Sequence, residues 1–123
     1  MYKKGDLVIF GDKHKLYLVL EDGLSDIGMI EVKDLNTHKG LQINPQGVKR
    51  FWLQKGDTFM FNFDKVNMFE ITQVDVQRSI YDGELEIAIF CRNLTSDVDG
   101  FIQRYTENFL RNKIEFIDIG YDT

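Results

Sequence analysis

The chain has 123 residues, of which 43% are hydrophobic and 28% are charged, with a single proline. This composition is ordinary for a globular protein and excludes a disordered chain. The formal net charge of -5 is unevenly distributed, because residues 1–54 carry eight Lys/Arg and seven Asp/Glu, whereas residues 55–123 carry seven and thirteen. The acidic second half repels phosphate, so only the first half is expected to contact a nucleic acid.

The N-terminal residues lead directly into an apolar strand without the apolar core of a secretory signal, and no stretch approaches ~18 apolar residues. Cys91 is the only cysteine and lies in an apolar run, so it cannot form an intramolecular disulfide and is expected to be buried. These features predict a cytoplasmic protein that does not contact a membrane.

A short motif occurs twice. Residues 4–10 read KGDLVIF, and residues 55–61, which begin 51 positions later, read KGDTFMF. Gly-Asp followed by alternating or continuous apolar residues marks the start of a strand. The recurrence predicts two copies of one small β unit.

Five short strands are expected in the first copy. Pro45 cannot donate to a sheet, so a turn is predicted over residues 44–50, before the last strand. In the alternating segment, Ile30 and Val32 are expected to be buried, with Glu31 and Lys33 on the opposite face. The predicted strands span residues 7–10, 16–20, 29–35, 41–43 and 51–53.

The second copy repeats this order with longer hairpins, and residues 107–112 take the place of the proline turn. Its predicted strands span residues 55–63, 68–76, 84–93, 101–106 and 114–119. In this alignment residues 16–20 correspond to residues 68–72, residues 34–35 to residues 93–94, and Trp52 to Ile114. An alternative is a single helix over residues 97–113, where apolar residues recur near helical spacing, which would make the second copy an α+β domain.

The first copy resembles SH3-like barrels of the KOW and Tudor type in three features. These are the sequence Lys-Lys-Gly-Asp-Leu-Val at positions 3–8, an apolar second strand, and a proline turn before a last strand that carries aromatic residues. The resemblance implies an all-β fold, or a mainly β fold with a short C-terminal helix, made of two tandem SH3-like small barrels packed together. The predicted domains are residues 1–53 and an elaborated barrel of residues 54–123. Domains of this type bind RNA, DNA, protein surfaces or modified side chains rather than catalyse reactions.

In size and composition the chain also resembles small accessory proteins of large tailed phages: it is compact and acidic, and rich in Asn, Asp, Ile and Phe. The first hypothesis is therefore a non-enzymatic protein-interaction module, a phage-type accessory or regulator acting on a host protein. The alternative is a KOW-type regulator of transcription or translation that binds nucleic acid through residues 1–53. Self-association through open strand edges is a further expectation.

Aromatic and basic residues of the first copy form the candidate partner-binding set. Three aromatics on neighbouring strands could line a groove with a positive rim, which suits single-stranded nucleic acid or an acidic, methylated or proline-rich peptide. Burial of the same aromatics in the core is the alternative interpretation. The set comprises Phe10, Lys13, Lys15, Tyr17, Lys49, Arg50 and Trp52.

In the second copy Phe59, Phe61 and Phe63 alternate onto one face of a strand. This stripe is interpreted as core packing, with an interface between the two barrels or with a partner as the alternative.

The residues that could carry chemistry do not form a recognisable constellation. His14 and His38 lie in predicted turns and lack the further ligands that a zinc site needs, and no serine has the setting of an activated nucleophile. The acidic pairs Glu84/Glu86 and Asp97/Asp99 are interpreted as solvated, with a metal-dependent hydrolase or nuclease as a remote alternative. We therefore expect no enzyme activity, no metal and no cofactor.

Overall fold

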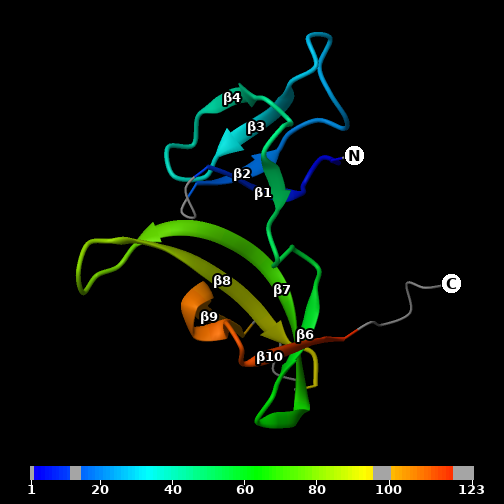
Figure 1. The fold of residues 1–123 in the computed structure, drawn as a ribbon. Helices are drawn as coiled ribbons and strands as arrows, with labels where there is room; N and C mark the ends of the chain where they lie inside the picture. Colours follow the sequence, from blue (N-terminus) through cyan, green and yellow to red (C-terminus); the bar gives the residue numbers. More distant parts are fainter. Residues whose placement is uncertain (1, 12–14, 96–100, 118–123) are drawn as a thin grey trace, which may run out of the picture.

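The computed structural model describes residues 2–11, 15–95 and 101–117, which form two five-stranded antiparallel sheets, one above the other in Figure 1. The first sheet has the strand order β4-β3-β2-β1-β5. Its strands are β1 (Leu7–Phe10), β2 (Leu16–Val19), β3 (Ile30–Asp34), β4 (Gly40–Ile43) and β5 (Val48–Arg50). No helix in the described part of the chain is long and apolar enough to span a membrane.

The second sheet has the order β10-β6-β7-β8-β9, so in both sheets the first four strands form a meander and the fifth returns to pair with the first. A helical turn, α1 (Glu107–Leu110), precedes the last strand, and Thr106 caps it by accepting from the Phe109 N–H. The strands are β6 (Thr58–Phe61), β7 (Asp64–Arg78), β8 (Leu85–Asn93), β9 (Ile102–Thr106) and β10 (Ile114–Ile117).

The strand registers confirm most of the predicted alignment of the two units. Tyr17 pairs with Asp34 in the first sheet as Phe69 pairs with Asn93 in the second. The assignment of Trp52 to Ile114 is wrong, because Ile114 pairs with Phe61 and the equivalent residue Phe10 pairs with Val48. The counterpart of Ile114 is therefore Val48.

The fifth strand of the first sheet begins three residues earlier than predicted. Gly47 adopts φ 87°, which lets the chain reverse at once after the proline turn and start β5 at Val48. Residues 51–53, predicted as this strand, instead leave the sheet and carry Phe51 and Leu53 into buried positions between the sheets.

Two further expectations are corrected in the second unit. Phe63 does not continue the buried stripe of Phe59 and Phe61, because the β6–β7 hairpin turns at residues 62–63 and leaves Phe63 72% exposed. The single helix over residues 97–113 is also wrong for its described part, which is β9 followed by α1. Residues 97–100 lie outside the described residues.

Both sheets are open rather than closed into barrels in the described part of the chain. No ladder joins β4 to β5 or β9 to β10, and each of these strands has only three to five residues. The fold is therefore mainly β, with two tandem units of equal strand order and one short helix.

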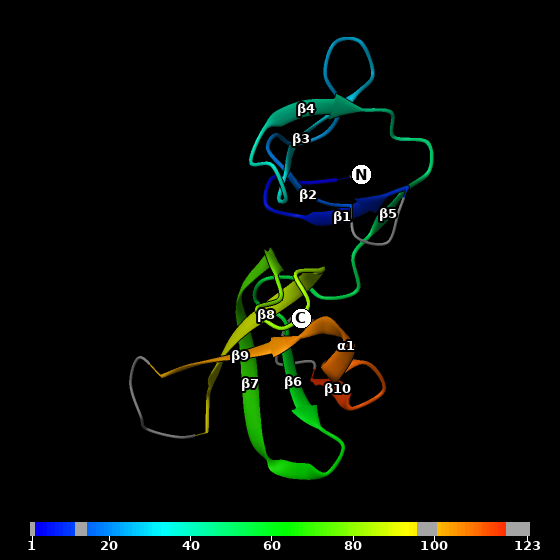
Figure 2. The ribbon, with the colours of Figure 1, turned by 90° about the vertical axis from the view of Figure 1, so that its left-hand side faces the viewer.

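The first sheet lies above the second in Figure 2, and buried side chains of both sheets form one cluster. Successive residues of β1 and β2 point to opposite faces, and both faces are covered. Val8 and Tyr17 belong to a core within the first unit, whereas Leu7 and Leu16 belong to a second core shared with β6, β7 and β8. Coverage on both faces explains why the first two strands read as continuous apolar runs.

Candidate functional site

The two Lys-Gly-Asp motifs are structural turns with the same hydrogen bonds. Gly5 N–H donates to the carbonyl of Val19, the last residue of β2, and Gly56 N–H donates to the carbonyl of Ile71, in the middle of β7. The two glycines adopt φ 95° and 92°, which side-chain-bearing residues rarely adopt. The motif therefore starts the first strand of each unit.

The candidate aromatic groove of the first unit is divided between two cores. Tyr17 is buried and Phe10 is half-buried in the core within the first unit, whereas Trp52 packs against the core shared by the two sheets. Burial of Tyr17 raises the pKa of its hydroxyl, and the nearby carboxylate of Asp34 raises it further. The structure does not bring the three rings onto one face.

Trp52 connects the linker to the second unit. Its indole N–H donates to the Glu107 carboxylate at 2.8 Å, and its ring lies edge-on to Phe116 at 6.3 Å between centroids. The guanidinium of Arg111 lies 5.7 Å from the ring centroid and also pairs with Glu107. These contacts give Trp52 a structural role in joining the two units.

The basic residues of the candidate set remain on the surface where the structure describes them. Lys49 and Arg50 are exposed on β5, an edge strand, and Lys15 is exposed just before β2. The Lys15 carbonyl accepts from Phe10 N–H, and Lys49 pairs with Ile9, so both lie beside the end of β1. Lys13 lies outside the described residues.

The residues that could carry chemistry are dispersed. His38 is in an exposed turn, and His14, Asp97 and Asp99 lie outside the described residues. Burial raises the pKa of the Cys91 thiol to about 12, so the thiol stays protonated at neutral pH. Within the described ranges, no three His, Cys, Asp or Glu side chains come together as metal ligands.

The most exposed large apolar side chains of the described chain lie at the tip of the β7–β8 hairpin. Ile80 is 90% exposed and Tyr81 is 92% exposed. In Figure 1 this hairpin projects to the left, below the first sheet. This pair was not singled out from the sequence, although two large apolar residues between the predicted strands 68–76 and 84–93 were the available clue.

The tip, residues 79–84, is held in shape by local hydrogen bonds. Ser79 N–H donates to the Glu84 carbonyl at 2.8 Å, and Gly83 N–H donates back to the Ser79 carbonyl at 2.9 Å. The Ser79 hydroxyl accepts from Tyr81 N–H, and the Arg78 guanidinium donates to the Gly83 carbonyl. Ile80 and Tyr81 are therefore presented by an ordered turn.

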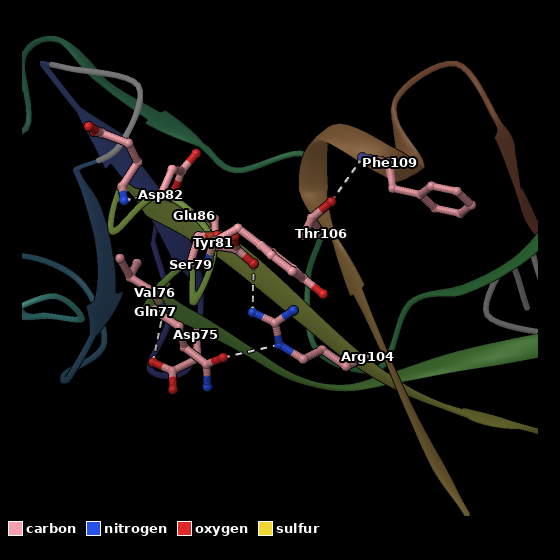
Figure 3. A network of polar contacts seen from close by, with 11 residues as sticks. Asp75, Val76, Gln77, Ser79, Tyr81, Asp82, Glu86, Arg104, Thr106 and Phe109 are labelled. Atoms are coloured by element: carbon pink, nitrogen blue, oxygen red, sulfur yellow. Dashed lines mark hydrogen bonds and ion pairs between the residues drawn. The ribbon is translucent and has the colours of Figure 1, made fainter.

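The base of the hairpin is tied to the neighbouring strand. Arg104 on β9 reaches Glu86 on β8 at 2.7 Å and Gln77 on β7 at 3.1 Å, as Figure 3 shows. The Arg104 side chain thus spans three strands beneath the tip. Glu86, one of the acidic pair Glu84/Glu86, is accordingly ion-paired rather than free.

Two hollows flank the hairpin. One, of about 360 Å³, is lined by residues that include Tyr81, Gln77 and Arg104, and the other, of about 450 Å³, by residues that include Asp82, Glu84 and Asn108. From Asp75 to Glu86 the hairpin carries four carboxylates and one arginine. The two hollows beside the apolar pair are lined by Asp82, Glu84 and Glu86 and by Arg78 and Arg104, so the rim has an excess of one negative charge.

Comparison with known proteins gives no relative for this arrangement. Neither a family model, nor a curated protein, nor a solved structure matches the chain.

Proposed function

We propose that the chain is a non-enzymatic protein-interaction module built from two SH3-like units, and that it binds a partner protein through the tip of the β7–β8 hairpin. The observation that carries the proposal is the near-complete exposure of Ile80 and Tyr81 on an ordered turn. The shared strand order, with a meander and a returning fifth strand, supports the SH3-like, KOW or Tudor resemblance.

The energetics of binding favour such a tip. Full burial of a side chain such as Ile80 contributes roughly 1.5–3 kcal/mol, and tyrosines are enriched among the residues that dominate interface energies. Because the turn is already ordered, little conformational entropy is lost when it docks. Each side chain of this tip has more exposed surface to bury in a complex than the half-buried Phe10 and Trp52, and so can contribute more binding energy.

The rim defines the chemistry of the partner. Asp82 and Glu84 at the tip would repel an acidic surface and attract a basic one. The partner is therefore a protein with an apolar pocket bordered by lysine or arginine. Because the composition of the chain resembles that of phage accessory proteins, we propose that the partner is a host protein and that binding regulates it.

The test compares the double variant Ile80→Ser/Tyr81→Ser with a matched control. Ile27→Ser changes a side chain that is 74% exposed in a different loop, so it removes exposed apolar surface away from the tip. Crosslinking capture from host lysate identifies the partner, and calorimetry with the purified partner measures affinity. We expect the double variant to lose affinity by about 100-fold or more, with Ile27→Ser unchanged.

Far-UV circular dichroism and thermal unfolding must be the same for both variants. Wild-type affinity of a folded Ile80→Ser/Tyr81→Ser protein would overturn the proposed surface.

A second candidate function is nucleic-acid binding through residues 1–53, and the exposed cations at the end of β1 favour it. It requires that affinity for a fluorescent single-stranded oligonucleotide fall steeply as salt rises, because each neutralised phosphate releases counterions. Lys49→Glu/Arg50→Glu should abolish this binding. Affinity that is independent of salt, or unchanged in that variant, would exclude the function.

A further inference from the structure

A cleft of about 460 Å³ lies between the two units. The first unit contributes Leu7 and Leu18 from the face of its sheet that is turned toward the second unit, and Leu35 from the end of β3. The second unit contributes residues 72–75 of β7, where the register with β8 shifts between Ile71 and Gln73. The volume lies in the range of small-molecule sites, which are common between domains.

Two lysines line this cleft from opposite units. Lys33 pairs with Leu18 across β2 and β3, so its side chain starts on the same face of the sheet as the apolar floor. Lys55 comes from the second Lys-Gly-Asp turn. Among the described residues neither lysine has a carboxylate within ion-pair distance, although Asp75 also lines the cleft.

His38 also lines the cleft, from an exposed turn. Its backbone has φ 64°, and its N–H donates to the Asp34 carbonyl at 2.7 Å. The Asp34 carboxylate accepts from the N–H groups of Asn36 and Thr37, so the turn that carries His38 is ordered.

We infer that this cleft is a binding site for a small amphipathic anion, with an apolar body against Leu18, Leu35 and Val74 and a carboxylate, phosphate or sulfonate group between Lys33 and Lys55. Charge complementarity carries the choice of ligand. The lining has two lysines and one carboxylate, whereas the whole chain has a net charge of -5. Unpaired cations beside an apolar floor attract an anion that also has apolar surface to bury.

The experiment uses two matched fluorescent probes, 8-anilinonaphthalene-1-sulfonate and its uncharged analogue N-phenyl-1-naphthylamine. We expect the full-length protein to bind the sulfonate saturably with one-to-one stoichiometry and more tightly than the neutral probe. In Lys33→Gln/Lys55→Gln the affinity for the sulfonate should fall by about tenfold, whereas the affinity for the neutral probe should not change.

Lys3→Gln/Lys39→Gln is the control, because it makes the same change in net charge with exposed lysines that do not line the cleft. It should bind both probes as the wild type does. Amide chemical-shift changes on addition of the sulfonate should centre on His38 and residues 72–75.

Three results would overturn the inference: equal binding of the two probes, equal weakening in both double variants, or shift changes centred on Ile80 and Tyr81. The last result would mean that the probe binds the exposed hairpin tip, and would leave the proposed protein-binding function intact.

Discussion

Gln54 is the residue on which the junction between the units depends most directly. It is buried, and its side chain donates to the carbonyls of Leu7 and Phe51 and accepts from the Leu7 N–H, at 2.7–2.8 Å. Its own N–H donates to the Asp57 carboxylate. The pKa of Asp57 is raised overall by burial, although this hydrogen bond and the charge of Arg50 act in the opposite direction.

Replacing Gln54 by leucine keeps the volume of the side chain but removes all three of its hydrogen bonds. The Leu7 N–H loses its acceptor in a buried place, so we expect the free energy of unfolding to fall by about 2–4 kcal/mol. Urea denaturation measures the change. Gln42→Leu, at an exposed position of β4, should stay within about 0.5 kcal/mol of the wild type. A loss below ~1 kcal/mol for Gln54→Leu would show that this hydrogen-bond set is dispensable.

At the scale of elements, each unit begins with the same Lys-Gly-Asp turn and continues into the same order of strands. In both turns the backbone carbonyl of the aspartate accepts a hydrogen bond from an N–H of the second strand, that of Val19 in the first unit and that of Ile71 in the second. The turn thus fixes the register of the first hairpin. A glycine is needed because its backbone has positive φ, not because space is short: a Cβ on Gly5 or Gly56 would meet nothing within 4 Å.

Gly5→Ala and Gly56→Ala should therefore be destabilising to similar extents. Each alanine would have to adopt a strained backbone conformation, at a cost of about 1–2 kcal/mol, and the two costs should add in the double variant. Gly40→Ala is the matched control, since Gly40 has no positive φ and a Cβ there would make only an ordinary contact at 3.9 Å. Chemical denaturation compares the four variants with the wild type. Unequal costs for Gly5 and Gly56 would argue against equivalent turns.

At the scale of the whole molecule, the two sheets share one buried core and should unfold together. Leu7, Phe51 and Leu53 lie in the same cluster as Phe59 and Ile89 of the second sheet. A unit of about 50 residues has only a marginal core by itself, so the shared surface is a large part of its stability. Trp52 is the only tryptophan and lies at this junction.

Unfolding curves followed by Trp52 fluorescence and by far-UV circular dichroism should therefore coincide. A double-mutant cycle with Trp52→Phe and Glu107→Ala should give a coupling energy of about 1–2 kcal/mol, because the indole N–H donates to a largely buried carboxylate. The same cycle with Glu115→Ala should give no coupling, since Glu115 pairs with Lys65. Two separate transitions would show that the units are independent.

Much of the secondary structure could be predicted because it follows from local patterns. Alternation placed Ile30 and Val32 inside, and both are fully buried. The predicted correspondence of residues 34–35 with residues 93–94 is confirmed by equivalent hydrogen bonds. Leu35 N–H donates to the Leu16 carbonyl, and Leu94 N–H donates to the Met68 carbonyl. The fifth strand of the first unit was misplaced because an apolar run such as residues 51–53 does not reveal whether it packs within a sheet or between sheets.

The candidate site was less predictable for the same reason. Phe10, Tyr17 and Trp52 are all aromatic, and only the packing of the two sheets assigns them to different cores. The exposure of Ile80 and Tyr81 likewise depends on how far the β7–β8 hairpin extends beyond the sheets.

The sequence by itself determined the repeat, because Lys-Gly-Asp and the apolar runs act through neighbouring residues and backbone geometry. Only the tertiary structure decided which apolar residues are buried, which stay exposed, and which charged side chains lack an opposite charge. That outcome depends on contacts between residues far apart in the chain, such as Leu7 with Gln54 and Trp52 with Glu107. Such contacts leave no periodic pattern in the sequence, and so the exposed hairpin tip and the cleft beside Lys33 and Lys55 became visible only in the folded chain.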